Sequence, residues 1–328
     1  MPRTVSSPGP KSQGFRGRRG FQEAHHPKTR GIMEIMRHHY VPQFLLRAWA
    51  ETMPDKKVET FRLSLPHLPS SRHAPKHTAY EENLYALTMP VVAGMEQQAV
   101  EKHLLRHIDE LAAGVLRKLT TTGLAALTPD DRSDWARFLM SLRLRQPSIV
   151  QQLRTESSEN LEASLIDTPE EYDAVAGTGN PPTLVEWTRM NYPGLIENFG
   201  MSFFHELVDN PKVGEKILRM KWWLWDFTRE QNDLLLADHP CIFTKGIDDP
   251  DLVIALPIGP RKAFMATMTD RVATIMRRQC PKDLLMRMNE SSLGQARVRI
   301  YARDTSPRRF ICNRLVRRRS AEQRGVPA

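Results

Sequence analysis

The hydrophobic pattern in the middle of the chain is helical. From Met95 to Leu119, apolar residues recur every three or four positions, which places them along one stripe of a helix. A second helix is predicted to begin at Thr128, where Thr-Pro-Asp-Asp combines a capping box with proline at the first helical position, and to end before Pro147. Further helices are expected over residues 148–165 and 183–209, the latter with a break at the Pro-Gly pair 193–194.

Both ends of the chain carry patterns that are typical of short strands. Strands are predicted over 57–63 and 83–87, with a short helix over 42–50 that begins at a proline. After Lys212 the chain turns to short apolar or alternating runs, and one helix is expected over 281–293. The runs are 222–227, 234–237, 252–256, 264–267 and 298–301. The predicted fold class is α+β, in which the middle helices form a cluster packed on one mixed or antiparallel sheet built from N- and C-terminal strands.

The domain organisation follows from composition. Residues 1–35 are rich in Pro, Gly, Ser and Arg and lack a hydrophobic period, which predicts a disordered basic extension. We expect translation to start at Met33 or Met36. Residues 36–302 are expected to form a single α+β domain, and residues 303–328 a basic, flexible C-terminal tail.

The charge of the chain lies at its two ends. The formal net charge is +9, yet residues 1–30 and residues 303–328 each carry +6, so the body between them is at −3. The Arg-rich ends could bind nucleic acid without sequence preference. The body gives no such indication, because a nucleic-acid-binding domain usually carries its positive charge on its own surface. Protein partners are not indicated.

Several classes of protein are disfavoured. The chain has no run of 18 apolar residues, so no membrane span is predicted, and its N-terminal residues lack the apolar region of a secretory signal. The three cysteines are widely spaced, which argues against a disulfide framework and favours a cytoplasmic location. Nucleotide-binding, serine-hydrolase and zincin motifs are absent from the sequence.

One stretch is specific enough to indicate a family. Residues 38–44 read His-His-Tyr-Val-Pro-Gln-Phe, residues 82–85 read Glu-Asn-Leu-Tyr, residues 145–147 read Arg-Gln-Pro, and residues 235–240 read Leu-Leu-Ala-Asp-His-Pro. These segments resemble the family catalogued as domain of unknown function 4238, over nearly all of 36–302. The resemblance implies a common architecture and carries no established activity.

The chain departs from the family pattern at three positions. Ala237 stands where the family has a small hydroxyl residue, His239 where it has Asn, and Asp109 where it has Glu. Asp238 is retained.

His38 and His39 are the first candidates for chemistry. Imidazole is a common metal ligand and the usual acid or base near neutral pH. Two adjacent residues of an extended strand point in opposite directions, so both cannot face one ion. The alternative is that the pair anchors the N-terminal segment through hydrogen bonds.

Carboxylates supply the next candidates. Asp238 ends an apolar strand just before Pro240, which suits a metal ligand or general base but equally a turn in which the carboxylate caps N–H groups. Glu101 and Asp109 lie eight residues apart on the long helix, roughly 80° around its axis. They either share a broad inner face or pair with basic neighbours.

Three further polar residues complete the candidate set. Arg47 and Arg145 follow apolar helical stretches, where a half-buried guanidinium either clamps a phosphate or carboxylate or simply pairs with Asp238 or Glu101. Asn289 lies in the middle of a predicted helix, where asparagine is a poor helix former, so a specific hydrogen bond is expected.

These candidates support two hypotheses. In the first, the protein is a metal-assisted hydrolase of phosphodiesters. A divalent metal ion is the one cofactor considered; His39, Asp238, Glu101 and Asp109 are its possible ligands, and His38, Arg47, Arg145 and Asn289 complete the site. In the second, the protein is a non-catalytic binding or interaction protein whose polar cluster is structural. Convergence of these side chains on one open pocket would favour the first.

Overall fold

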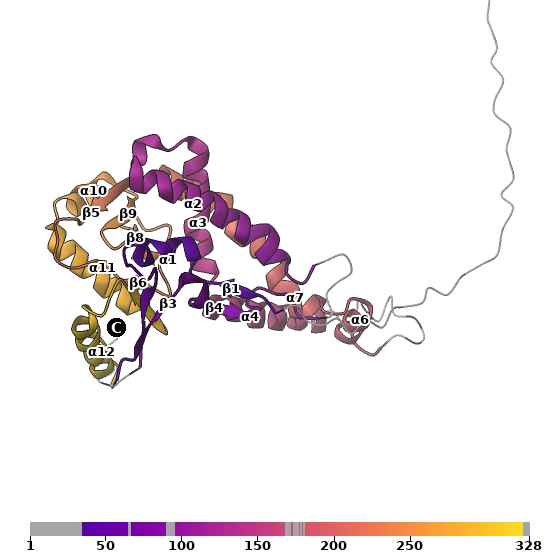
Figure 1. The fold of residues 1–328 in the computed structure, drawn as a ribbon. Coiled ribbons are helices and arrows are strands. Elements are labelled where there is room, and N and C mark those ends of the chain that lie inside the picture. The colour runs from indigo at the N-terminus through magenta and orange to yellow at the C-terminus, as the bar shows by residue number, and fades with distance from the viewer. Residues whose placement is uncertain are drawn as a thin grey trace, which may run out of the picture. The chain divides into compact units, whose positions relative to one another are not determined.

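Short strands from both ends of the chain pair with each other, and the helices of the middle pack beside them (Figure 1). The computed structural model describes residues 35–64, 67–89, 96–167, 172, 177, 179 and 181–323. Residues 35–328 cluster as one compact unit. The α+β prediction is therefore confirmed. Except for Ile35, the expected disordered extension over residues 1–35 lies outside the described residues.

The described part of the chain contains three antiparallel sheets, so the expectation of one sheet is wrong. The first pairs β1 (Arg37–His39) with β4 (Tyr80–Glu82). The second has the order β3-β2-β10-β6, and the third the order β5-β9-β8-β7. Their bounds are β2 Val58–Arg62, β3 Ser70–His73, β5 Lys221–Asp226, β6 Leu236–Ala237, β7 Ile242–Phe243, β8 Val253–Gly259, β9 Lys262–Thr267 and β10 Arg299–Ala302.

The break between the second and third sheets has a local cause. The sequence Asp238-His239-Pro240-Cys241 separates β6 from β7. Proline cannot donate a ladder hydrogen bond, so the run cannot continue as one strand. β6 therefore pairs with β10, whereas β7 pairs with β8.

The predicted helices are largely present. The capping box at Thr128 forms: its side chain accepts the N–H of Asp131, whose carboxylate accepts the N–H of Thr128. Pro147 begins the next helix. The helices are α1 Gln43–Ala50, α2 Arg106–Thr121, α3 Pro129–Leu144, α4 Pro147–Ile166, α6 Leu184–Asn191, α7 Leu195–Ser202, α8 Phe204–Val208, α9 Pro211–Arg219, α10 Asp270–Arg277, α11 Pro281–Gln295 and α12 Arg308–Gln323, with short 3-10 turns η1 Pro75–His77 and η3 Leu124–Ala126.

Two predicted segments differ from the structure. Residues 83–87, expected as a strand, form a turn in which Asn83 has a φ of 55°. The C-terminal tail, expected to be flexible from residue 303, contains helix α12 instead. Ile311 of α12 is fully buried in a second hydrophobic cluster with Phe61 and Ile300, so packing holds this Arg-rich helix in place.

The main hydrophobic core joins α1 to the third sheet and to α2 and α3. Trp49 of α1 is fully buried, and its indole N–H donates to the Leu234 carbonyl at 2.9 Å. The smaller core lies between the second sheet, α11 and α12. No helix among the described residues is long and apolar enough to cross a membrane.

Candidate functional site

A widened turn opens the long helix. Residues Val100–Leu105 form a π-helical segment, η2, that leads directly into α2. In it the N–H of Arg106 bonds to the carbonyl of Glu101, five residues back. Such π turns are rare and recur at functional sites. The turn carries Glu101, and Asp109 follows in the first turn of α2.

Arg145 lies at the end of α3 with its side chain fully buried. One guanidinium nitrogen lies 2.9 Å and 3.2 Å from the two carboxylate oxygens of Asp109, and another donates to the Ser141 hydroxyl at 2.6 Å. The Tyr85 hydroxyl donates to the Arg145 carbonyl at 2.7 Å. A buried charge requires such partners, because its transfer out of water is otherwise very unfavourable.

Glu101 and Asp109 are both in the field of this guanidinium. Burial raises the pKa of Glu101 to about 7; Arg145 opposes the shift and Asp109 adds to it. Burial also raises the pKa of Asp109, again opposed by Arg145. The Asp109 side chain keeps 27% of its surface exposed, although its Oδ1 is buried. Asp109 contacts the buried guanidinium, whereas Glu101 lies only within its field and also within that of the exposed Arg106, and burial still raises the pKa of both carboxyls.

His38 supports this cluster from β1. Its side chain is fully buried, its Nδ1 accepts the N–H of Tyr85 at 2.8 Å, and its ring stacks on the Tyr85 ring with centroids 5.2 Å apart. Burial lowers the pKa of His38 to about 4, and the charges of His39 and Arg154 act in the same direction, against a hydrogen bond with Gln98. His38 is therefore neutral at physiological pH, with Nδ1 as the acceptor. Its role here is to hold Tyr85, which in turn contacts Arg145.

The structure places the other predicted residues elsewhere. His39 contacts Tyr80, with ring centroids 5.5 Å apart, and burial lowers its pKa to about 4 as well. The Arg47 side chain is exposed on α1. Neither position is part of the hydrogen-bond network described above among the residues that the structure describes.

The Asp238 carboxylate accepts hydrogen bonds from backbone N–H groups. One carboxylate oxygen accepts the N–H of Arg297 at 2.9 Å, and the other accepts those of Val298 and Arg299 at 2.6 Å and 2.9 Å. Although burial acts to raise it, bonds from His239 and from these N–H groups hold the pKa of Asp238 below its usual value. This carboxylate is saturated and is 4% exposed, so it has a structural role.

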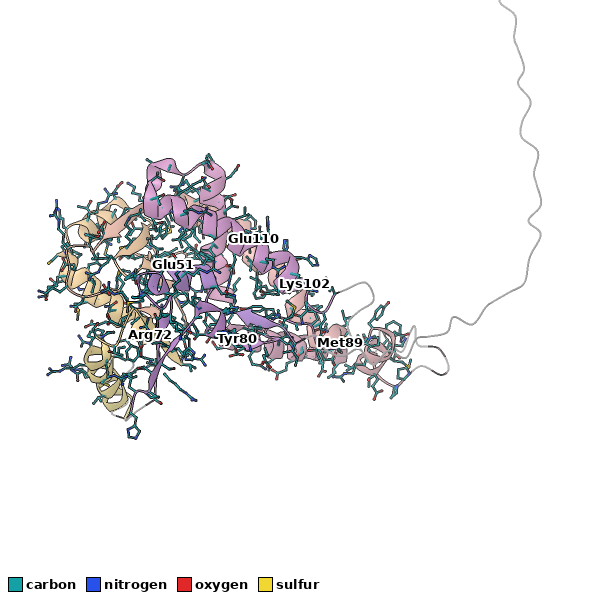
Figure 2. All side chains as sticks on the ribbon, viewed as in Figure 1. Glu51, Arg72, Tyr80, Met89, Lys102 and Glu110 are labelled. Carbon is teal, nitrogen blue, oxygen red and sulfur yellow. The ribbon has the colours of Figure 1, made fainter. Side chains whose placement is uncertain are left out.

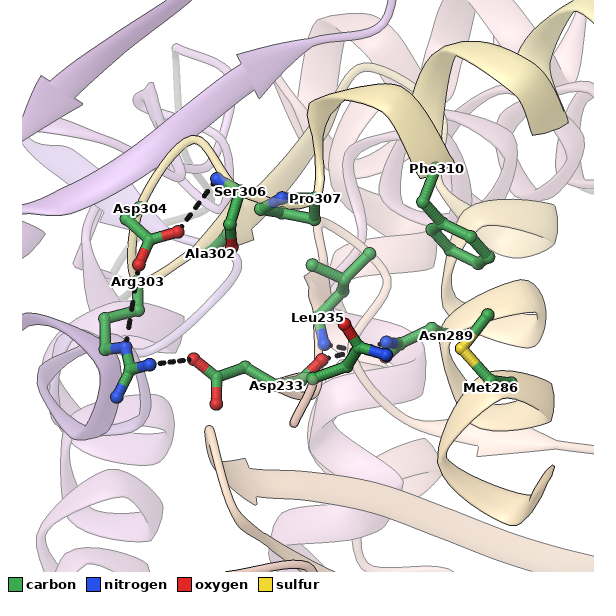
Figure 3. A pocket seen from close by; sticks show the side chains of 11 residues that line it. Asp233, Leu235, Met286, Asn289, Ala302, Arg303, Asp304, Ser306, Pro307 and Phe310 are labelled. Carbon is green, nitrogen blue, oxygen red and sulfur yellow. Dashed lines mark hydrogen bonds and ion pairs between the residues drawn. The ribbon is translucent and has the colours of Figure 1, made fainter. Parts of the chain in front are cut away.

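Asn289 also bonds to the backbone, at the wall of a pocket. Its side chain accepts the N–H of Leu235 at 2.8 Å and donates to the carbonyl of Asp233 at 2.9 Å. Figure 3 shows the pocket, with Asp233 and Arg303 on one side and Met286 and Phe310 on the other. Asp233 is already paired with Arg303 at 2.8 Å and with Arg261.

The predicted metal-ligand set is therefore not assembled. Among the described residues, no group of three or more His, Cys, Asp or Glu side chains could hold a metal ion. Asp109 contacts Arg145, and the charges of both act on the pKa of Glu101. Asp238 does not join them, because its oxygens are occupied by N–H groups of residues 297–299.

A family comparison can now be set beside this geometry. A family described as "Protein of unknown function (DUF4238)" matches residues 37–306. The chain belongs to this family. No significant match was found among curated proteins or among solved structures. The matched range covers His38, Glu101, Asp109 and Arg145, so the whole cluster lies within the DUF4238 region.

Two parts of the cluster escaped the sequence reasoning. Tyr85 lies in the Glu-Asn-Leu-Tyr segment that contributes to the family resemblance, but nothing local indicates its contacts with His38 and Arg145. The π turn has no recognisable sequence signal either. The Tyr85 contacts join residues that are 47 and 60 positions apart in the chain.

Proposed function

We propose that this DUF4238 protein is a metal-assisted hydrolase of phosphodiesters, with Glu101 and Asp109 as the two carboxylate ligands of a divalent cation. The observation that carries the proposal is the unfavourable negative charge of these two carboxylates: burial raises the pKa of both, although Arg145, and for Glu101 also the exposed Arg106, acts against the shift. A proton compensates this charge at or below neutral pH. A divalent cation compensates it at higher pH.

The number of protein ligands suits Mg²⁺ best. Mg²⁺ is commonly held by only one or two carboxylates, while waters and substrate phosphate oxygens fill the remaining positions. Those ligands would reach the cation from the exposed part of the Asp109 side chain, since its Oδ1 is buried. An anionic phosphodiester would otherwise be repelled by the carboxylates, so a bridging cation and this class of substrate belong together.

Arg145 contributes charge and position. Its contacts with Asp109 and Ser141 fix the guanidinium beside the carboxylates. From there its positive charge stabilises the negative charge that develops on the phosphate oxygens. Tyr85 and His38 act one step further away, since they hold the Arg145 backbone and the Tyr85 ring. They are positioning residues in this proposal.

The test compares Glu101→Gln with Glu110→Gln in the full chain. Glu110 lies on the same helix with its side chain exposed, so it controls for the loss of one charge (Figure 2). Mg²⁺ and Mn²⁺ are expected to raise the melting temperature of the wild type and of Glu110→Gln but not of Glu101→Gln. Hydrolysis of bis(p-nitrophenyl) phosphate should fall by about 10²-fold or more in Glu101→Gln alone.

The pH profile provides a second readout. Metal binding requires an ionised Glu101, so activity should rise with pH through about 7, the pKa of that carboxyl. Equal metal responses in the two glutamine variants would contradict the proposal. So would a wild type that hydrolyses no phosphodiester with either metal.

A non-catalytic interaction protein is the second candidate. Asp238 and Asn289 bond to backbone groups, and Arg145 is fully buried, which is the behaviour of structural polar residues. On this alternative, substitutions in the cluster change the stability of the protein, and neither the wild type nor the variants respond to a metal ion. The metal-induced thermal shift therefore separates the two candidates.

A further inference from the structure

Two arginines face each other across the second sheet. Arg62, the last residue of β2, lies directly opposite Arg299, the first residue of β10. The next pair outward is joined by a hydrogen bond from the N–H of Leu63 to the carbonyl of Val298, at 2.8 Å. Arg62 and Arg299 therefore occupy a non-hydrogen-bonded position, where opposite side chains of an antiparallel pair are closest.

Like charges at such a position repel each other. The Asp238 carboxylate offsets only part of the repulsion: its charge acts on Arg299 and, with Tyr40 and Tyr301, raises the pKa of that guanidinium against the effect of burial. Asp238 lies beside Arg299, since its N–H donates to the Arg299 carbonyl, but its own oxygens point at the backbone N–H groups of residues 297–299. Within the described residues, neither guanidinium has an ion pair.

The face of the sheet beneath the pair supplies neutral hydrogen-bonding groups. The Arg299 guanidinium donates to the Tyr40 hydroxyl at 2.8 Å. Thr60 and Tyr301 form the next pair on the same face, two residues further along each strand. Arg62 is exposed and Arg299 is half-buried, so these opposite residues both border the surface of the sheet beside polar groups.

We propose that Arg62 and Arg299 together bind a phosphate group. A phosphate has enough oxygens to accept from two guanidiniums at once, whereas a carboxylate is filled by a single arginine in the bidentate arrangement. The bound anion replaces the repulsion within the pair by two attractions. This site is separate from Glu101 and does not depend on its chemistry.

The first experiment measures phosphate binding by calorimetry at constant ionic strength, so that general screening is held fixed. The full chain is compared with Arg62→Gln, with Arg299→Lys and with Arg309→Gln, which removes an exposed arginine from α12. Phosphate binding should weaken about tenfold or more in Arg62→Gln, which lacks the guanidinium, and in Arg299→Lys, which replaces a bidentate guanidinium by a single ammonium. Arg309→Gln should bind phosphate as the wild type does. Equal affinity in all four proteins would overturn the proposal.

The direction of the change in melting temperature distinguishes an anion site from a merely structural role of Arg62. In chloride alone, Arg62→Gln should melt at a higher temperature than the wild type, because the repulsion is gone. In phosphate the order should reverse. A lower melting temperature for Arg62→Gln in both salts would mean that Arg62 is structural and that no anion site exists.

A third experiment, on oligonucleotide binding, identifies the source of the phosphate group. A short single-stranded oligonucleotide that binds at least 100-fold more tightly than inorganic phosphate, and that depends on Arg62, indicates a nucleic-acid backbone. Equal affinities that depend on Arg62 indicate a small phosphorylated ligand. Oligonucleotide and phosphate binding that both persist in Arg62→Gln would contradict the site itself.

Discussion

Two carboxylates in this protein, the buried Asp238 and the half-buried Glu101, have opposite electrostatic surroundings. Asp238 receives backbone N–H groups on both oxygens, and its pKa is lowered although burial acts to raise it. Glu101 has Asp109 as a neighbour and lies only within the field of Arg145, so burial prevails and its pKa rises to about 7. Burial alone therefore does not identify a functional carboxylate. The supply of donors around it decides whether its charge is satisfied or left in excess.

The comparison also bears on the two alternatives that the sequence leaves open for Asp238, a metal ligand or general base and a cap of N–H groups. Asp238 has the position of a catalytic residue, at the end of an apolar strand, yet it holds the segment 297–299 in place. Glu101 lies on a helix face, where a carboxylate commonly pairs with a basic residue. In the structure, the turn that carries Glu101 is π-helical, a type that is rare and recurs at functional sites. The predictions below test whether these two regions differ in the way that their contacts indicate.

The largest effect is expected from Arg145→Met. This change removes the only guanidinium that contacts Asp109 among the described residues and leaves a partly buried carboxylate without its partner. Breaking a buried pair in this way should destabilise the protein by about 3–5 kcal/mol. Urea unfolding at pH 8 measures it. The double variant with Asp109→Asn should recover part of the loss, and a loss below about 1 kcal/mol for Arg145→Met would show that the pair is not needed.

A smaller loss is expected from Asp238→Asn. The amide retains one acceptor oxygen and turns an N–H₂ group toward backbone donors, which should cost about 2–3 kcal/mol near neutral pH. Since the folded-state pKa of Asp238 is lowered, its contribution is present above the usual pKa of an aspartate and is lost as pH falls through the folded value. Unfolding curves from pH 7 to pH 3 should therefore converge for variant and wild type. Curves that stay parallel would contradict the assignment.

The smallest of the three effects has the opposite sign. The folded-state pKa of Glu101 is raised from 4.5 to about 7, so the wild type loses stability as pH rises through that interval. Glu101→Gln removes this loss and should be more stable than the wild type at pH 8, by about 2 kcal/mol once partial exposure is considered. The difference should vanish toward pH 4.5. Glu110→Gln should stay within about 0.5 kcal/mol of wild type throughout.

A gain of stability from Glu101→Gln would sharpen the contrast with Asp238. A carboxylate that lowers stability and is nevertheless present is better explained by function than by folding. Destabilisation by Glu101→Gln at pH 8 would place Glu101 in the same structural class as Asp238.

Local signals predicted much of the helical part of the fold. Thr128 and Pro147 mark the beginnings of α3 and α4 because capping and the missing proline N–H act within a few residues. The short helix after Pro42 was predicted for the same reason. The α+β class followed from the position of the strand-like runs at the two ends.

The site depended on longer-range contacts, which local signals do not contain. Asp109 and Arg145 are 36 residues apart, and His38 and Tyr85 are 47 apart. The prediction of a flexible tail from residue 303 is wrong for a similar reason. The arginines of this segment suggest a solvated tail, whereas Phe310 and Ile311 pack α12 against Phe61 and Ile300. The sequence names His38, Glu101, Asp109 and Arg145 as candidates, but their positions relative to Arg145 are not derivable from local signals.

The pairing of β2 with β10 has a consequence for synthesis. β2 ends at residue 62, and its neighbour begins at residue 299, so nearly the whole domain must be translated before the second sheet can close. Until then β2 and β3 present an open edge, and Asp238 lacks the N–H groups that satisfy it. Contacts this distant in sequence slow folding and leave the nascent chain exposed to association. A chain that stops before residue 297 is therefore expected to need a chaperone or to aggregate, even though every helix that precedes α12 is complete.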